Sequence, residues 1–273
     1  MTPFLAAVVQ MTSGTDVSSN LTVADNLIAK AAYQGAKLVV LPENFAFMGQ
    51  RDTDKFTLAE ADGEGPIQAF LSQQARQHKL WLIGGTIPIR AAADKVFTSC
   101  IIFDDTGQRV GRYDKMHLFD VDLPGGRESY SESATIQPGT TPLLLSTPLG
   151  KLGFSICYDL RFPELYRQLS EAGAEIIVAP SAFTATTGAQ HWHVLTRARA
   201  LENQTYLLAP NQGGRHENGR ETFGHSLIVD YWGTVLAELK QQQDVICALI
   251  DLPALHDKRA SFPALAHRRL TTQ

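Results

Sequence analysis

The sequence is poor in several features that would assign the protein to a specialised class. It has only three cysteines, Cys100, Cys157 and Cys247. Their odd number and wide spacing argue against a disulfide framework and favour a reducing compartment, so we expect a cytoplasmic location. No apolar stretch approaches the roughly 20 residues that a membrane-spanning helix needs. No basic segment precedes the first apolar run, at residues 4–9, so we expect no secretory signal.

The sequence also lacks an excess of charge of one sign. It has 24 Lys and Arg against 28 Asp and Glu, a formal net charge of -4, and no basic run. A nucleic-acid partner is therefore not expected. Gly and Pro are not in excess, which argues against a fibrous or disordered chain. With 44% hydrophobic residues in 273, the chain can bury one large core. We predict a single domain over residues 1–273, with a C-terminal tail from about residue 252.

Strand-like and helix-like segments alternate along the chain, which predicts an α/β fold. The segment 120–139 is polar and rich in Gly, Ser and Pro, and it is predicted to be a long loop. The predicted strands are 4–9, 37–41, 80–83, 96–103, 109–113, 151–156, 175–179, 205–209, 225–230 and 234–239, and the predicted helices are 22–33, 66–78, 163–172 and 190–203.

One internal similarity suggests that the fold contains two related βαβ halves. Residues 35–43 (GAKLVVLPE) resemble residues 173–181 (GAEIIVAPS). Each stretch follows a predicted helix, forms a buried strand and ends in Pro plus a polar residue. The alternative is that any helix–Gly–strand junction has this form. Sites in α/β sheets gather at the carboxyl ends of strands. Glu43, Cys157 and Ser181 each follow a predicted strand and are therefore candidates for one site.

Cys157 has the position of a reactive thiol, between a predicted strand and a predicted helix. Unpaired N–H groups at the start of a helix favour a thiolate, and the N–H of Tyr158 could bind an oxyanion. The alternative is a buried structural cysteine. Cys100 and Cys247 lie within apolar strands and fit that alternative well.

Glu43 and Lys115 supply the charges that such a thiol would need. A carboxylate in a desolvated pocket could act as a general base, and an ammonium could stabilise both a thiolate and an oxyanion. The commoner roles of such residues are a surface Glu after a strand and a solvated Lys.

Three stretches containing these residues resemble the nitrilase superfamily of carbon–nitrogen hydrolases. They are LPEN at 41–44, DKMHL at 114–118 and CYDLRFPE at 157–164, and the resemblance extends from Phe4 to about Asp251. It implies a four-layer αββα sandwich, a Glu43–Lys115–Cys157 site with no cofactor, and at least a homodimer. It also implies a second carboxylate in the long loop. Glu132 fits that place, with Glu128 as the alternative.

The second half of the chain resembles the Nit amidases within this superfamily, a group that includes ω-amidase and deaminated glutathione amidase. The matching stretches are PSAF at 180–183, TG at 187–188, HW at 191–192, RARA at 197–200 and GHS at 224–226. QGGRH at 212–216, followed by FGHS at 223–226, is closer to deaminated glutathione amidase. This resemblance implies metabolite repair, in which deaminated glutathione is hydrolysed to 2-oxoglutarate and Cys-Gly through a cysteine thioester.

Two other functions remain open alternatives. One is an ω-amidase that acts on α-ketoglutaramate or α-ketosuccinamate. The other, of a different class, is a catalytically silent protein that binds a metabolite or senses redox state. Intact Glu43, Lys115 and Cys157 favour an enzyme.

The small-molecule substrate is expected to contact six residues near the nucleophile. Arg215, in a Gly-rich loop, could hold a substrate carboxylate through two hydrogen bonds, and the alternative is a solvated loop arginine. The six predicted oxyanion or substrate-binding residues are Tyr158, Arg161, Ser181, Phe183, Thr187 and Arg215.

Histidines raise the question of a metal site. His191 and His193 form a His-x-His pair, with His216 and His225 further along the chain. Side chains at i and i+2 of a helix point apart, so no metal site is expected.

Overall fold

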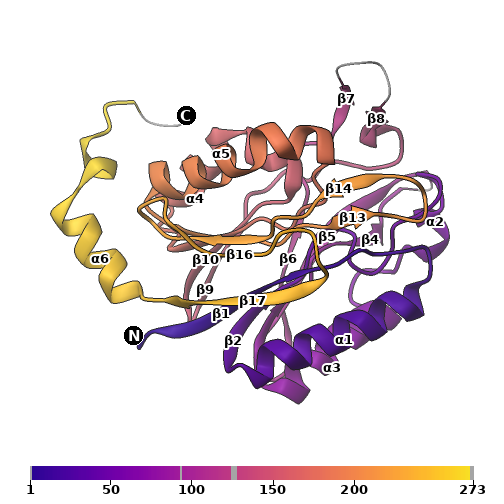
Figure 1. The fold of residues 1–273 in the computed structure, drawn as a ribbon, viewed down its shortest axis with the longest axis horizontal. Helices are drawn as coiled ribbons and strands as arrows, with labels where there is room; N and C mark the ends of the chain where they lie inside the picture. The colour runs from indigo at the N-terminus through magenta and orange to yellow at the C-terminus, as the bar shows by residue number, and fades with distance from the viewer. Residues whose placement is uncertain (1, 93, 124–127, 271–273) are drawn as a thin grey trace.

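The protein has two β-sheets packed face to face, with a pair of helices on the outer side of each. The computed structural model describes residues 2–92, 94–123 and 128–270. In Figure 1, α4 and α5 cover one side of the strands and α1 and α3 cover the other. The predicted four-layer αββα sandwich is confirmed.

The first sheet contains three parallel strands joined by two crossover helices. The helices are α1 (Val17–Tyr33) and α3 (Pro66–His78). The strand order is β17-β1-β2-β3-β5-β4, with β6 paired to β5. The strands are β1 (Phe4–Gln10), β2 (Ala36–Val40), β3 (Trp81–Ile83), β4 (Ile87–Arg90), β5 (Val96–Phe103), β6 (Arg109–Asp114) and β17 (Asp244–Ile250).

The second sheet repeats this topology. Strands β10, β11 and β12 are parallel and are joined by α4 (Pro163–Glu171) and α5 (Ala185–Asn203). Antiparallel β9 and β15 flank them, as β17 and β5 flank the three parallel strands of the first sheet. The two halves are therefore related, as the internal similarity predicted. The strands are β9 (Leu144–Thr147), β10 (Gly150–Phe154), β11 (Ile176–Val178), β12 (Tyr206–Ala209), β15 (Leu227–Val229) and β16 (Val235–Glu238).

Alternate residues of the central strands face two different apolar layers, which explains their continuous hydrophobicity. In β1, Ala6 and Val8 belong to the main core, which includes residues of both sheets, whereas Ala7 and Val9 pack with residues of α1 and α3. Strands buried on both faces need apolar residues at every position. This double burial holds the strand ends, where the candidate residues lie, in fixed places.

Two helices begin earlier than the sequence periodicity predicts, because polar side chains cap them. Helix α1 begins at Val17, not near residue 22, and its cap Asp16 accepts a hydrogen bond from the Ser19 N–H at 2.7 Å. Helix α5 begins at Ala185, not near residue 190, and Thr184 accepts from the Thr187 N–H at 3.1 Å. A cap lowers the free energy of the first turn by about 1 kcal/mol, so a helix can extend beyond its apolar stripe.

The prediction of a long loop at 120–139 is wrong in part, because this segment contains regular structure. Strands β7 (Asp120–Asp122) and β8 (Ser129–Ser131) pair antiparallel and are followed by the 3-10 turn η1 (Glu132–Ala134). Residues 124–127 within this segment lie outside the described part of the chain. The remaining short elements before the C-terminal segment are α2 (Lys55–Leu58), η2 (Cys157–Arg161), β13 (Gly213–Arg215) and β14 (Glu221–Phe223).

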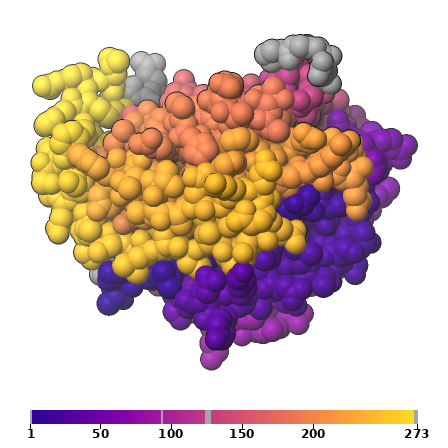
Figure 2. Space-filling model, viewed as in Figure 1, coloured from indigo at the N-terminus to yellow at the C-terminus, as the bar shows by residue number. Residues whose placement is uncertain are grey.

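The C-terminal segment returns to the first sheet before it forms the predicted tail. After β17, the tail folds as α6 (Leu252–Ser261) and η3 (Ala264–His267), and residues 271–273 lie outside the description. In Figure 2 the last third of the chain covers one face beside the first third. Leu252 and Leu255 of α6 are buried in the main core. No helix within the described ranges is long and apolar enough to cross a bilayer.

Candidate active site

Cys157 lies on a sharp turn directly after the second-half strand β10. It is the first residue of η2, and its φ of +46° is in the left-handed region, which is uncommon for a residue other than glycine. Its N–H donates to the Pro180 carbonyl at 2.9 Å. The longer helix α4 begins only at Pro163. The expected placement of the thiol at the start of that helix is therefore corrected to a short 3-10 turn.

Asp159 holds this turn in place. Its Oδ2 accepts hydrogen bonds from the Ile156 N–H at 2.8 Å and from the Tyr113 hydroxyl at 2.7 Å. Its Oδ1 accepts from the His117 N–H at 3.0 Å. The side chain is fully buried, so these bonds form away from water. They join the Cys157 turn to the segment that carries Lys115. Sequence reasoning missed Asp159, although a carboxylate three residues into a turn is a capping signal.

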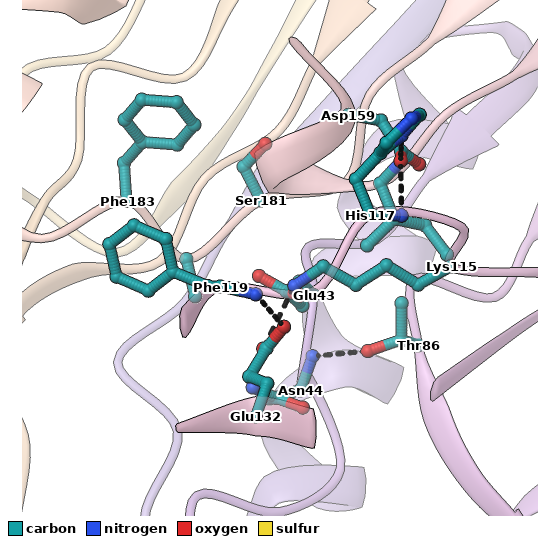
Figure 3. A network of polar contacts seen from close by, with 12 residues as sticks. Glu43, Asn44, Thr86, Lys115, His117, Phe119, Glu132, Asp159, Ser181 and Phe183 are labelled. Carbon is teal, nitrogen blue, oxygen red and sulfur yellow. Dashed lines mark hydrogen bonds and ion pairs between the residues drawn. The ribbon is translucent and has the colours of Figure 1, made fainter. Parts of the chain in front are cut away.

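Lys115 bridges two carboxylates. Its Nζ lies 2.9 Å from Glu43 Oε1 and 2.9 Å from Glu132 Oε1. Figure 3 shows these three side chains meeting. Glu132 is fixed in turn, because its Oε2 accepts a hydrogen bond from the Phe119 N–H at 2.8 Å. The Lys115 side chain is only 1% exposed. Three charged side chains that are distant in the sequence therefore form one continuous ionic chain.

Glu43 is anchored by residues of both halves. It follows β2, is 2% exposed, and its carbonyl accepts a hydrogen bond from Gln212 Nε2 at 3.0 Å. The next residue, Asn44, has a left-handed φ of +57°, and its N–H donates to Thr86 Oγ1 at 2.8 Å. The carboxylate is thus held by its backbone as well as by Lys115.

The charges of this cluster shift the pKa values of its members in opposite directions. Burial disfavours the Lys115 ammonium, but Glu132 and Glu43 outweigh this effect and raise its pKa. Burial likewise disfavours the Glu132 carboxylate, yet Lys115 holds its pKa below the usual range. Burial and the negative charge of Glu43 raise the pKa of Cys157, against the opposing effects of Lys115 and the Ala182 N–H. The expectation of a lowered thiol pKa is therefore corrected, because burial and Glu43 both favour the neutral thiol.

Glu43, Lys115, Glu132 and Cys157 all line one small cavity of about 290 Å³. The guanidinium of Arg161 lies 5.8 Å from the ring centre of Tyr158 and 5.5 Å from that of Phe183, so cation–π attraction holds it at the wall. The other lining residues are Phe119, Tyr158, Arg161, Ala182, Phe183, Thr184, Thr187 and Arg220. The structure therefore brings the four predicted catalytic residues together with Tyr158, Arg161, Phe183 and Thr187.

Two predicted substrate contacts, Ser181 and Arg215, lie outside the cavity. The structure also distinguishes Glu132 from Glu128. Ser181 is fully buried outside the cavity lining, and its hydroxyl donates to the Ala179 carbonyl at 2.8 Å. Arg215 is exposed on β13 and is also absent from the lining. Glu128 accepts from the Tyr130 and Thr186 hydroxyls, both at 2.8 Å, so Glu132 is the carboxylate at the cavity.

Arg220 occupies the place that sequence reasoning gave to Arg215. It lines the cavity, its guanidinium lies 5.2 Å from the ring centre of Tyr130, and its Nη2 donates to the Ala182 carbonyl at 2.6 Å. Its Nε is buried without a hydrogen-bond partner among the described residues. The sequence shows two arginines in one polar loop, and only the β13–β14 hairpin geometry tells which of them faces inward.

The two histidines of the His-x-His pair contact different residues. His191 Nδ1 lies 3.2 Å from Arg161 Nη1, whereas His193 Nε2 lies 2.9 Å from Glu238 Oε1. The side chains of His191 and His193, two positions apart on α5, therefore point in different directions, as helix geometry requires. His225 Nδ1 contacts the same Glu238 oxygen at 2.6 Å, which makes His193, His225 and Glu238 a compact cluster outside the cavity lining.

Comparison with known proteins identifies the family. The carbon–nitrogen hydrolase family matches residues 5–260. The chain belongs to this family. A relative from Synechocystis, named deaminated glutathione amidase, is 44% identical over 98% of this chain and 99% of its own length.

Solved structures of carbon–nitrogen hydrolases agree with the fold described above. Nit3 of Saccharomyces cerevisiae, a member of branch 10 of the nitrilase superfamily, superposes with a TM-score of 0.87 at 34% identity, over 98% of this chain and 97% of that one. The NitFhit protein of C. elegans gives a TM-score of 0.91 at 38% identity and 98% coverage of this chain. This chain spans only 65% of that structure, less than two thirds of its length.

Proposed function

We propose that this protein hydrolyses the amide bond of deaminated glutathione to yield 2-oxoglutarate and Cys-Gly. The observation that carries the proposal is the convergence of Glu43, Lys115 and Glu132 with the Cys157 thiol on one cavity. The near full-length similarity to a relative of that name supports the choice of substrate. The proposed chemistry uses side chains and one backbone N–H, with no metal or organic cofactor.

Acylation begins with a neutral thiol and a nearby base. Glu43 takes the Cys157 proton as the sulfur attacks the carbon of the scissile amide. The negative charge moves to the amide oxygen, where the Lys115 ammonium and the Tyr158 N–H stabilise it. Protonated Glu43 then gives its proton to the departing nitrogen of Cys-Gly, and the carbon–nitrogen bond breaks. A thioester on Cys157 remains.

Deacylation uses the same groups in reverse order. Glu43 removes a proton from a water molecule, and the resulting hydroxide attacks the thioester carbon. The proton returns to the sulfur, and 2-oxoglutarate leaves. Glu132 keeps its negative charge throughout, because its hydrogen bonds to Lys115 and to the Phe119 N–H both favour the carboxylate.

The part of the cavity lined by the start of α5 suits the α-keto acid end of the substrate. Thr184 and Thr187, at the start of the 19-residue helix α5, line the cavity. The N-terminal end of a helix carries partial positive charge that attracts a carboxylate. The guanidinium groups of Arg161 and Arg220 add to this attraction, so we assign the substrate carboxylate to this wall.

The experiment that tests the proposal compares two substrates. Steady-state kinetics on deaminated glutathione and on α-ketoglutaramate should give the higher kcat/KM for deaminated glutathione. Intact-protein mass spectrometry after rapid quenching should detect an acyl group of the same mass on Cys157 with either substrate. A clear preference for α-ketoglutaramate would reassign the protein as an ω-amidase. Absence of turnover and of any adduct would instead favour the silent binding protein.

The proposal includes a homodimer in the cytoplasm. Val194 and Leu201 are exposed by 68% and 49% on one face of α5. Trp232, exposed by 47%, lies in the turn at residues 231–233. These apolar side chains support a contact with a second copy. Light scattering on the purified protein tests the dimer, and Leu201→Glu should shift it to a monomer.

A further inference from the structure

A second, larger cavity adjoins the one that contains Cys157. Its open volume is about 1110 Å³, and it shares Phe119, Glu132 and Arg220 with the smaller cavity. We call it the side groove, defined by the lining residues Asn44, Phe47, Met48, Gly49, Gln50, Arg51, Asp52, Lys55, Ile87, Pro88, Thr98, Phe119, Ser129, Tyr130, Ser131, Glu132, Ile136, Asn218 and Arg220. The shared wall makes the two cavities neighbours with a common boundary at Glu132.

Lys55 lines the side groove and has a charge that no ion pair within the described part of the chain balances. Its Nζ donates a hydrogen bond to Thr135 Oγ1 at 3.2 Å, and no ion pair to it is found among the described residues. By contrast, Arg51 is paired with Asp54 at 2.9 Å. Burial lowers the pKa of Lys55, although Asp52 and Glu132 oppose this. A half-buried ammonium without an ionic partner gains most from an anion that enters beside it.

The direction of the leaving group identifies which part of a substrate reaches this groove. In the proposed mechanism Glu43 must give its proton to the departing nitrogen, so the leaving group lies on the Glu43 side of the sulfur. Asn44, which directly follows Glu43, lines the side groove, as does Glu132 on the other side of Lys115. Thr184 and Thr187, at the start of α5, line the smaller cavity but not the side groove. The leaving group therefore projects toward Lys55 and the acyl group toward α5.

We propose that the side groove binds the peptide leaving group of the amide substrate and that Lys55 pairs with its terminal carboxylate. This inference rests on the proposed function and extends it to a leaving-group site. Its ligand class is a short peptide amine with a free C-terminal carboxylate.

The test is kinetic and uses substrates with a common acyl half. Deaminated glutathione releases Cys-Gly, whereas α-ketoglutaramate releases ammonia. Lys55→Met should raise KM for deaminated glutathione roughly 10-fold or more, because hydrogen bonds to charged groups contribute about 1.5–3 kcal/mol. It should leave kcat/KM for α-ketoglutaramate within about 2-fold. Lys55→Arg, which keeps the charge, should retain most of the affinity.

A substrate change supplies the second arm of a double-mutant cycle. Deaminated glutathione with its glycine carboxylate converted to an amide should lose affinity in the unchanged enzyme, and Lys55→Met should cause little further loss. Lys95→Met is the matched control. Lys95 donates to the carbonyls of Ser133 and Ala134, next to the Thr135 that Lys55 contacts, but it does not line the groove. This control should change neither KM.

The outcomes separate this inference from the proposed function. Equal losses on both substrates with Lys55→Met, or no loss on either, would overturn the leaving-group site while wild-type turnover persists. No turnover of either substrate by the wild-type protein would overturn the proposed function itself, and the leaving-group site with it. Thermal unfolding of each variant shows that it is folded, and removal of a partly buried cation with no ion pair should not lower stability.

Discussion

The Lys115 Nζ lies 2.9 Å from Glu43 Oε1, and neither side chain is more than 3% exposed. The same ammonium lies 2.9 Å from Glu132 Oε1, so one cation faces two carboxylates. With Cys157 as a neutral thiol, the cluster carries one negative charge more than it can balance. That charge gives it the capacity to accept one proton, which is what the proposed attack of the sulfur requires.

Replacement of Cys157 should abolish turnover without unfolding the protein. Cys157→Ala removes the proposed nucleophile, and the expected loss in kcat is at least about 10⁴-fold by comparison with other covalent enzymes. The alanine variant should keep its circular dichroism spectrum and show no acyl adduct. Cys247→Ala is the control, because this partly exposed residue of β17 lies in the sheet, away from the cavity lining. Persistent turnover in Cys157→Ala would contradict the assignment.

Glu43→Gln should change thiol reactivity and turnover in opposite directions. Burial and the Glu43 charge raise the pKa of Cys157, whereas Lys115 lowers it. Without that carboxylate the thiolate fraction at neutral pH rises, so iodoacetamide should alkylate Cys157 several-fold faster. Turnover should fall, since the base is lost. Peptide mapping of the alkylated protein measures the first effect. Glu128→Gln, outside the cavity, should alter neither, and slower alkylation in Glu43→Gln would contradict the proposed electrostatics.

The Glu132–Lys115 pair should make stability depend on acid pH. Lys115 holds the folded-state pKa of Glu132 below its ordinary value of 4.5. A depressed carboxyl pKa contributes stability above the unfolded-state pKa, and this contribution is lost as pH falls through the folded-state value. Urea unfolding of the wild type between pH 6 and about 3 should therefore show a decline that Glu132→Gln reduces. Parallel pH profiles for the two proteins would contradict this pairing.

Arg220 and Arg215 should differ sharply as substrate contacts. Arg220→Gln should raise KM for deaminated glutathione by about 10-fold to 100-fold, from the loss of a charge-assisted hydrogen bond. Arg215→Gln should have no measurable effect, because that residue is exposed and outside the cavity. The two variants change the same residue type within one hairpin, so each controls for the other. Equal effects would show that the cavity wall is wrongly assigned.

Apolar periodicity predicts most strands and helices of this fold, whereas the four layers and the ionic cluster are what the resemblance to the nitrilase superfamily implies. The buried strands 37–41 and 151–156 each place a functional residue just beyond the sheet. The predicted strand 96–103 coincides with β5, and the predicted helix 66–78 coincides with α3. Such segments have strong apolar periodicity, and Pro at the start of α3 marks its first turn.

The features that sequence analysis missed depend on tertiary contacts. No local pattern predicts that Arg220 rather than Arg215 faces the cavity, since both lie in one polar loop. The raised pKa of Cys157 also escaped prediction, because it follows from burial and from the distance to Glu43, which lies 114 residues earlier in the chain. Asp159 carried a readable capping signal, whereas its bonds to Tyr113 and His117 cross from one half to the other.

The repeated topology of the two halves has a consequence for how the protein can evolve and be engineered. The proposed base and cation come from the first repeat and the sulfur from the second, so neither repeat alone could have carried out this chemistry. The two repeats produced as separate polypeptides should accordingly regain activity only when they are mixed.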